Sequence, residues 1–351
     1  GTDLRQQHNN ITGNAMTIAG FFTRRRAVVT AIAATLLVAA PTFAQTASLR
    51  LINEYPATSI TASADLQFAA AVNKLSNGDI AVATLQEAAN PYKGKDQVSA
   101  VRDGKAEIGT LFAGILGGAD SFFLLSSLPF VVDDFDQAQN LFTCTRPELE
   151  RHLAALNMRL LYATPWPPSG IWSAKPVTDV ADIKALSIRT YDDNSRGVFQ
   201  RVGAQSVNLP FSAVGAKLTS GELNAVLSSG DGGAGNRLWD YLPNFTAISY
   251  AIPLSYTVIN NEAWNKLTPA QQSALTQAAK QTNEASWATV KSRIQDNYAR
   301  MTEHGMRLNL QPAAPVRVAL RQAGQEQADS WWQQDKNNEI RARCVPPVQA
   351  K

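Results

Sequence analysis

The chain has 351 residues, of which 45% are hydrophobic, with 32 Lys and Arg against 29 Asp and Glu. This length exceeds the usual size of one domain and predicts two. The first 44 residues hold four arginines and one aspartate, so residues 45–351 carry 28 charges of each sign. This balance argues against a nucleic-acid or acidic-membrane partner. The histidines, His8, His152 and His304, lack ligand spacing, so we expect no metal site and no cofactor.

The first 44 residues are typical of a leader. Residues 1–15 are polar and precede the first methionine, so we interpret them as a cloning remnant or a mis-assigned start. Arginines at 24–26, an uncharged run at 27–40 and a small-x-small end predict a secretory signal peptide cleaved after Ala44. The run is shorter than the roughly 20 residues of a membrane helix, so we expect a periplasmic protein that does not span the membrane. Both ordinary and twin-arginine export fit.

The next part of the chain alternates strands and helices, which predicts an α/β fold. The predicted strands are 49–55, 80–85, 107–112 and 159–163, and the predicted helices are 63–75, 95–102, 136–142 and 148–156. Residues 164–170 hold three prolines, which indicates a crossover or hinge loop that carries Trp166.

A strand, helix, strand, helix, strand run follows and predicts a parallel sheet. Its strands are 186–191, 207–209 and 224–227, with helices at 194–202 and from 212 to about 221. Ligands bind beyond the carboxyl ends of such strands, and Arg189 lies close to the end of its strand. A guanidinium suits a carboxylate, which it can hold by two parallel charged hydrogen bonds. The alternative is an exposed or structurally paired arginine.

The last third begins with an apolar strand at 249–259 that returns to the first domain. Thr268 and Pro269 start a helix in the favoured way, and its periodicity runs to about residue 304. One continuous helix would reach roughly 50 Å. Two helices broken near residues 282–283 fit the pattern equally, and a further amphipathic helix is predicted at 316–339.

The remaining chemistry of the chain is sparse. Cys144 and Cys344 leave a disulfide and two free thiols equally open in an oxidising periplasm. The sequence has no G-x-S-x-G elbow, no cysteine–histidine pairing and no zinc motif, so we expect a binding protein and not an enzyme. A secreted enzyme of another kind and a periplasmic sensor that binds a protein partner are the alternative classes.

Six short motifs, in a fixed order and spacing, carry a resemblance to a known family. They are Asn-Gly-Asp-Ile at 77–80, Val-Ser-Ala-Val-Arg-Asp-Gly at 98–104, Leu-Pro-Phe at 128–130, Asp-Ile-Lys-Ala-Leu-Ser-Ile-Arg at 182–189, Gly-Ala at 203–204 followed by Pro-Phe-Ser at 210–212, and Val-Ile-Asn at 258–260 followed by Trp-Asn-Lys-Leu-Thr-Pro at 264–269. With them the chain resembles the solute-binding proteins of tripartite ATP-independent periplasmic (TRAP) transporters, the DctP family.

The resemblance implies a fold and a mode of action. It implies an α/β, two-lobed periplasmic-binding-protein fold with a hinge cleft and a long helix bracing both lobes. Residues 45–165 and about 255–300 would form lobe I, and 166–254 and about 301–351 lobe II. Such a monomer would close on a small organic acid and deliver it to a two-component TRAP permease driven by an ion gradient.

The resemblance also assigns site residues. Arg189 falls on the arginine that clamps the ligand carboxylate in this family. Phe211 falls on the family's aromatic at the head of the following helix, where it would pack on the ligand or anchor the core. The aromatic candidates for the pocket wall are Tyr55, Phe112, Trp166, Trp172 and Phe211, which favour a monocarboxylate or a 2-oxo or 2-hydroxy acid with an aromatic or branched body.

Residues 227–235 depart from the family, whose common pattern there is Asp-Gly-x-Glu. This chain has a glycine-rich segment, which we interpret as a flexible loop before a helix starting near residue 236. Ser229 and Asp231 fall where polar ligand contacts are expected. The segment also satisfies the dinucleotide pattern G-x-G-x-x-G, but residues 251–256 lack the acidic ribose ligand, so we expect an anion-facing loop.

Overall fold

The computed structural model describes residues 46–345, which fall in one compact unit that begins at Ala44. The predicted signal peptide and its cleavage after Ala44 lie outside the described residues. None of the helices within 46–345 is both long and apolar enough to cross a membrane.

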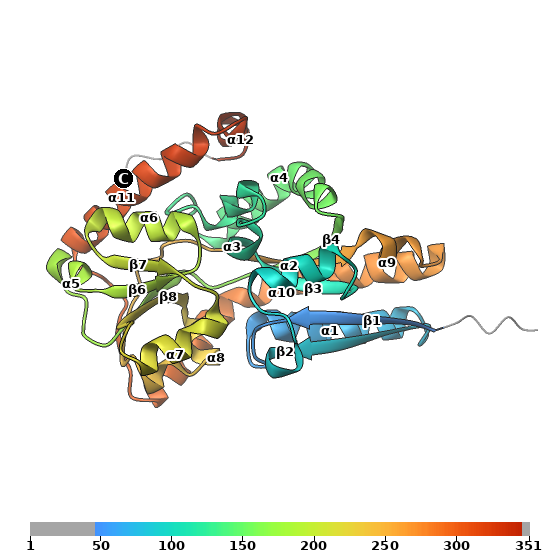
Figure 1. Ribbon diagram of the computed structural model, residues 1–351, viewed down its shortest axis with the longest axis horizontal. Helices are drawn as coiled ribbons and strands as arrows, with labels where there is room; N and C mark the ends of the chain where they lie inside the picture. The colour runs from blue at the N-terminus through green and yellow to red at the C-terminus, as the bar shows by residue number, and fades with distance from the viewer. Residues whose placement is uncertain (1–45, 346–351) are drawn as a thin grey trace, which may run out of the picture. The chain divides into compact units, whose positions relative to one another are not determined.

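The first sheet has the strand order β2-β1-β3-β10-β4 (Figure 1). These strands are β1 (Ala47–Asn53), β2 (Ile80–Gln86), β3 (Ile108–Phe112), β4 (Met158–Pro165) and β10 (Leu254–Asn260). β1 pairs in parallel with β2 and β3, whereas β10 runs antiparallel to β3 and β4. The late strand β10 therefore inserts between two early ones, as the predicted return to the first domain requires.

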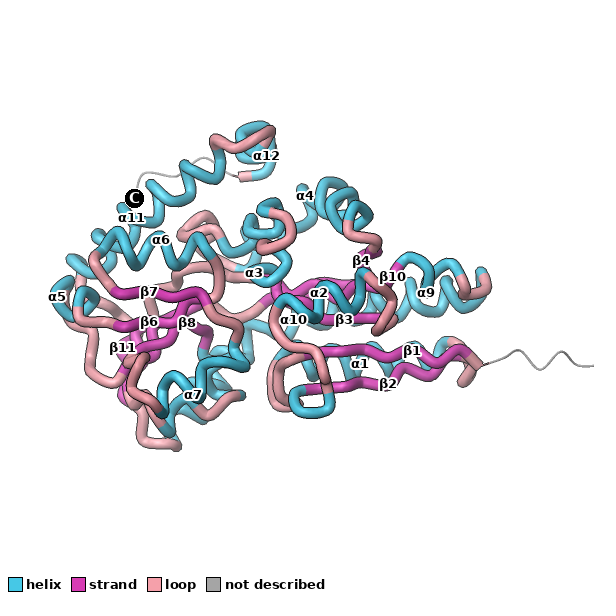
Figure 2. The backbone as a smooth tube through the Cα atoms, in the orientation of Figure 1, coloured by secondary structure: helices cyan, strands magenta, loops and turns pink. Residues whose placement is uncertain are grey.

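The second sheet has the order β11-β9-β5-β8-β6-β7. Figure 2 labels its strands β6, β7, β8 and β11. Its strands are β5 (Ser169–Ser173), β6 (Ser187–Thr190), β7 (Gln205–Asn208), β8 (Ala225–Ser229), β9 (Asn244–Thr246) and β11 (Arg307–Asn309). β6 pairs in parallel with β7 and β8, which confirms the predicted parallel sheet. β5 runs antiparallel to β8 and β9, because it enters the sheet directly from the crossover.

Two short crossings and one long helix join the sheets. β4 leaves the first sheet at Pro165 and β5 starts at Ser169, so the predicted proline-rich loop is reduced to residues 166–168. Residues 247–253 return the chain from β9 in the second sheet to β10 in the first. The long helix is α10 (Pro269–Glu303), a single helix of 35 residues. Thr268 caps α10 by accepting a hydrogen bond from the Gln271 amide. α10 contacts α1 (Ile60–Leu75) and β4 on one side of the molecule and α8 (Gly230–Gly235) on the other, so it braces both sheets.

The other helices lie over the sheets or join them. They are α2 (Lys95–Arg102), α3 (Ala113–Leu116), α4 (Phe135–Ala155), α5 (Val180–Lys184), α6 (Asp193–Val202), α7 (Val214–Thr219), α9 (Asn261–Asn265), α11 (Ala314–Trp332) and α12 (Asn337–Cys344). The disulfide between Cys144 and Cys344 links α4 to α12, which decides between the two predicted states of these cysteines.

Three predicted elements differ from the structure. The separate helices predicted at 136–142 and 148–156 are one helix, α4, which continues through Pro147. Pro147 removes the helical hydrogen-bond partner of the Thr143 carbonyl, and both residues lie on the exposed face, where that carbonyl is not buried without a partner. The helix predicted at 316–339 is two helices, α11 and α12, because the chain turns at Asp335 with a positive φ of 46°.

The third difference is the glycine-rich segment, which is not a flexible loop but the helix α8. Ser229 caps α8 by accepting a hydrogen bond from the Gly232 amide at 3.0 Å. A Cβ added at Gly233 would lie 2.1 Å from the Trp172 ring, so the absence of a side chain lets helix and ring pack directly. Tertiary packing therefore outweighs the poor helix propensity of glycine.

The boundaries of the two lobes remain a prediction. All strands of the first sheet fall in the ranges predicted for lobe I, within one residue at the start of β10. All strands of the second sheet fall in the ranges predicted for lobe II. Two sheets, two crossings and one long helix are the two-lobed α/β architecture that the motifs implied.

Candidate functional site

A cavity lies where the ends of the two sheets approach each other. It is small in this form, with about 20 Å³ of free space, which is room for about one water molecule. Its wall consists of Tyr55, Phe112, Trp166, Ser169, Arg189, Tyr191, Phe211, Ser228, Ser229, Gly232 and Pro253. These residues come from the first sheet, from the crossovers and from the carboxyl ends of β6 and β8, so both lobes enclose the cavity.

Arg189 supplies the positive charge of the cavity. It stands on β6 and is only 3% exposed. Its Nε donates to the Leu209 carbonyl at 2.8 Å and its Nη1 to the Leu227 carbonyl at 3.0 Å. Both acceptors are neutral, and no carboxylate within residues 46–345 forms an ion pair with it. Burial lowers the pKa of Arg189, yet a guanidinium keeps its charge in proteins, so this cation lacks a counter-ion.

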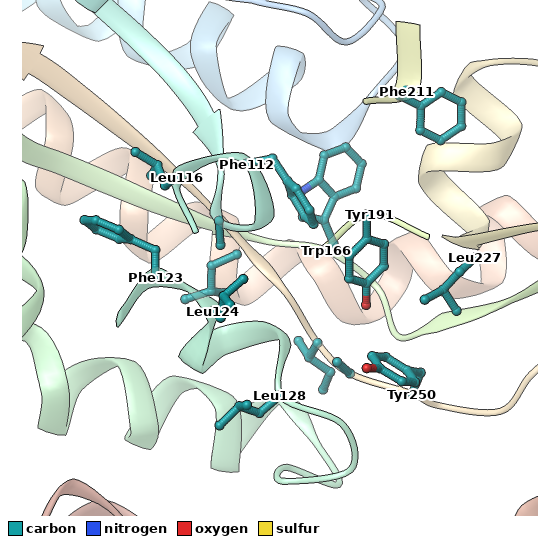
Figure 3. Packing of buried hydrophobic residues seen from close by; sticks show 14 of the residues in the cluster. Phe112, Leu116, Phe123, Leu124, Leu128, Trp166, Tyr191, Phe211, Leu227 and Tyr250 are labelled. Atoms are coloured by element: carbon teal, nitrogen blue, oxygen red, sulfur yellow. The ribbon is translucent and has the colours of Figure 1, made fainter. Parts of the chain in front are cut away.

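Aromatic rings form most of the remaining wall. The Tyr55 ring centroid lies 4.7 Å from that of Trp166 and 6.2 Å from that of Phe211. Tyr191 meets Phe112 edge-on at 5.3 Å, and Figure 3 shows these two rings and Trp166 close together. The guanidinium carbon of Arg189 lies 4.9 Å from the centroid of the Phe211 ring. The cavity thus combines one cation with flat apolar faces, which suits an organic anion with a compact body.

Hydroxyl groups line the part of the wall nearest β8. The Ser169 and Tyr191 hydroxyls lie 3.1 Å apart and share a hydrogen bond. The Ser229 hydroxyl is used in capping α8, while Ser228 lines the cavity beside it. These groups can each donate to or accept from a ligand oxygen, so they suit the polar end of a small acid.

A second charged group stands next to this wall. Glu54 precedes Tyr55 and is 8% exposed. Its Oε2 accepts a hydrogen bond from the Gly94 amide at 3.0 Å, while its Oε1 is buried and has no protein partner within the described residues. Burial raises the pKa of Glu54, whereas the Gly94 amide and the charge of Arg189 act in the opposite direction.

Six of the eight predicted ligand residues line the cavity: Arg189, Phe211, Ser229, Tyr55, Trp166 and Phe112. Their contact with a ligand stays a prediction. The other two predicted residues, Trp172 and Asp231, do not belong to the wall.

Trp172 lies behind the cavity. Its ring is fully buried, meets Phe245 edge-on at 5.5 Å and donates its indole N–H to the Ser229 carbonyl at 3.2 Å. It stands in the core because β5 directs this side chain toward Gly233, away from the opening between the sheets.

Asp231 is occupied by partners of its own. Its Oδ1 accepts from the Ile60 amide at 2.8 Å, and its Oδ2 accepts from Arg293 and, at 3.0 Å, from Asn297. This carboxylate therefore joins α8 to α1 and α10. Its three hydrogen bonds are made to these two helices and none of them involves a residue of the cavity wall.

The structure adds five wall residues that sequence reasoning missed: Ser169, Tyr191, Ser228, Gly232 and Pro253. One signal was present for Tyr191, because residues two apart on a strand face the same side and Arg189 is two residues before it. Ser169 is the first residue of β5 and Pro253 directly precedes β10, and no local pattern marks either as a wall residue.

Comparison with known proteins shows which family has this architecture. The DctP family, described as "Bacterial extracellular solute-binding protein, family 7", matches residues 53–335. A curated solute-binding protein of Albidiferax ferrireducens is 26% identical over 197 residues, which are 53% of this chain and 57% of that protein. The chain thus spans little more than half the length of this curated relative.

Two solved structures share the fold. DctP6 of Bordetella pertussis, an extracytoplasmic solute receptor binding pyroglutamic acid, has a TM-score of 0.79 at 26% identity over 85% of this chain and 97% of that one. A marine metagenome TRAP solute-binding protein specific for pyroglutamate has a TM-score of 0.80 at 23% identity, over 84% and 97% of the two chains. These matches confirm the resemblance drawn from the motifs. With its family match extending over residues 53–335, this chain belongs to the DctP family of bacterial extracellular solute-binding proteins.

Proposed function

We propose that this protein captures a small monocarboxylate between its lobes in the periplasm and delivers it to a TRAP-type permease. The observation that carries the proposal is the buried Arg189, which donates to two backbone carbonyls and forms no ion pair within residues 46–345. A desolvated cation without a counter-ion is costly, and a bound carboxylate removes that cost through charged hydrogen bonds.

The wall of the cavity narrows the ligand class. One arginine matches one carboxylate, and the rings of Tyr55, Phe112 and Trp166 match a compact apolar or planar body. The cavity has free space for about one water molecule in this form, so a ligand has to enter while the lobes are apart. The related receptor from Bordetella pertussis binds pyroglutamic acid, which is a small ring monocarboxylate. We therefore propose pyroglutamate or a similar ring or 2-substituted monocarboxylate as the ligand.

The mechanism is binding by lobe closure, without a chemical step on the ligand. Cavity residues come from both lobes, so separating the lobes opens the cavity and approach of the lobes desolvates the ligand. Contacts between the lobes, such as the hydrogen bond from the Ile60 amide to Asp231, hold the closed form. A closed monomer with the acid inside is the species that the permease would receive.

The test is ligand binding by residues 45–351 and by an Arg189→Ala variant. We expect L-pyroglutamate at about 100 times its Kd to stabilise the wild type by about 2.7 kcal/mol, seen as a thermal shift of a few degrees. Arg189→Ala should show no shift, because the carboxylate loses its charged partner. The matched control is Arg196→Ala, an exposed arginine on α6 of the same lobe, which should keep the full shift.

Two results would contradict the proposal. Binding that survives in Arg189→Ala would remove the arginine from the site. The absence of any shift across a panel of small carboxylates would favour a protein partner in place of a transported acid.

A further inference from the structure

Glu54 carries a buried oxygen atom that the fold does not use. Its side chain is buried next to the wall residue Tyr55, although Glu54 itself is not one of the residues that line the closed cavity, and Oε1 has no partner within residues 46–345. Buried carboxylate oxygens are almost always hydrogen-bonded in native proteins, because leaving one without a partner forfeits its hydration. An acceptor kept in this state points to a donor that arrives with another molecule.

The position of this oxygen is tightly held. The Gly94 amide donates to the other carboxylate oxygen, Oε2, at 3.0 Å. Gly94 in turn packs on Pro210, since a Cβ added at Gly94 would lie 3.2 Å from the Pro210 Cβ. Glu54 and Gly94 belong to the first lobe and Pro210 to the second, where it directly precedes the wall residue Phe211. The carboxylate is thus fixed at the place where the closed lobes meet.

Glu54 and Arg189 influence each other without pairing. Each appears among the charges that shift the pKa of the other, yet within the described residues they form no ion pair. Tyr55, the neighbour of Glu54, lines the cavity together with Arg189. A molecule that brings an anion to Arg189 and a hydrogen-bond donor to Glu54 would satisfy both of these buried groups.

We infer that Glu54 Oε1 accepts a hydrogen bond from an N–H or O–H group of the bound acid, so that the receptor selects carboxylates with a donor beside the carboxylate. The inference rests on the proposed function and adds a requirement to it. A ring N–H next to the carboxylate-bearing carbon, as in pyroglutamate, meets this requirement, and so does a 2-hydroxyl group. An acid with a CH₂ at that position would leave the Glu54 oxygen buried and unpaired.

The test compares two ligands on three proteins by calorimetric titration. L-pyroglutamate is paired with 3-oxocyclopentane-1-carboxylate, in which a CH₂ replaces the ring N–H and the rest of the ring is kept. The proteins are the wild type, Glu54→Gln and the control Glu150→Gln, an exposed residue of α4 that pairs with Arg146. We expect the wild type and the control to prefer pyroglutamate by roughly 10- to 150-fold, the range for a hydrogen bond to a charged group.

Glu54→Gln should lose most of this preference. The Gly94 amide requires an acceptor, so in this variant it holds the carbonyl oxygen of the new side-chain amide and turns the NH₂ group toward the ligand N–H. Two donors then face each other, and the affinity for pyroglutamate falls while that for the CH₂ analogue changes little. A preference that is unchanged in Glu54→Gln would overturn the inference and leave the proposed function intact, with a bound water as the partner of Oε1. Failure of the wild type to bind either acid would overturn both.

Discussion

Two arginines near the glycine helix α8 have different kinds of partner. Arg293 on α10 donates to Asp231 of α8 and to the Thr58 carbonyl, so its charge has a carboxylate partner inside the protein. Arg189 on β6 donates to the carbonyls of Leu209 and Leu227 and has no carboxylate partner within residues 46–345. Arg189 and Asp231 are both residues for which the sequence predicts a ligand contact.

The difference lies in the counter-ion. The Asp231 carboxylate accepts from three groups on α1 and α10, which accounts for its position without any ligand. Arg189 forms no ion pair within residues 46–345, and the buried Glu54 acts on its charge without pairing with it. Counting the partners of each buried charge therefore separates Asp231, whose partners belong to the protein, from Arg189, for which we propose a ligand carboxylate as the partner.

The largest effect is expected for Asp231→Ala, which tests whether this aspartate holds the fold together. It should lower the free energy of unfolding by about 3–5 kcal/mol, as for other buried ion pairs that lose one partner. Chemical denaturation measures the change. The control is Asp240→Ala, whose exposed pair with Arg237 is worth less than about 1 kcal/mol. If Asp231→Ala unfolds like the wild type but no longer binds the acid, Asp231 is a ligand contact after all.

A third buried acidic or basic group, the carboxyl of Asp65, makes the stability of the protein depend on pH. Asp65 on α1 accepts hydrogen bonds from Asn53, Thr110 and Tyr162 at 2.7, 2.6 and 2.7 Å and has no cationic partner among the described residues. Burial outweighs these bonds and raises the pKa of Asp65 from 3.8 to about 7. The folded protein thus holds this proton more tightly than the unfolded chain, so the stabilisation is full below pH 3.8 and is lost as the pH rises to about 7.

The expected size of this loss is about 4 kcal/mol, the free energy that corresponds to a pKa change from 3.8 to about 7. Urea unfolding from pH 4 to pH 8, compared with Asp65→Asn, measures it. The difference in stability between the two proteins should change in favour of Asp65→Asn as the pH rises. A difference that is constant over this interval would mean that the three hydrogen bonds keep Asp65 ionised.

The smallest effect is expected for the stability of Arg189→Met. Removing this arginine leaves two carbonyls without their donors but also removes a buried charge that has no ion pair. The two contributions oppose each other, so the free energy of unfolding should change by less than about 1.5 kcal/mol in the absence of ligand. Ligand binding should be lost. A destabilisation as large as that of Asp231→Ala would show that Arg189 holds the fold together.

Much of the fold could be predicted because its signals are local. The spacing of apolar residues, alternating in strands and helical in helices, predicted the bounds of β1, α1, β2 and α2 to within a few residues. Gly203, with a φ of 98°, ends α6 where a helix stop was expected. The cap formed by Thr268 and Pro269 located the start of α10, but not whether one helix or two would follow.

The site was predicted less completely, since its members come from distant parts of the chain. Arg189 was identified because the end of a parallel strand and a family motif coincide at one residue. Glu54 follows its strand in the same way, yet nothing in the local pattern distinguishes a free carboxylate oxygen from a solvated one. Trp172 and Asp231 do not line the cavity, because composition cannot tell which face of an element meets the other lobe.

The sequence by itself determined the α/β class, the order of most elements, the long helix as one of two alternatives and the arginine at the end of β6. These follow from periodicity, capping and strand order, which act over a few residues. Only the tertiary structure decided that the glycine segment is a helix, that Cys144 pairs with Cys344, and which buried charges have partners. Each of these depends on groups brought together from far apart in the chain, where the free energy of packing and desolvation exceeds any local preference.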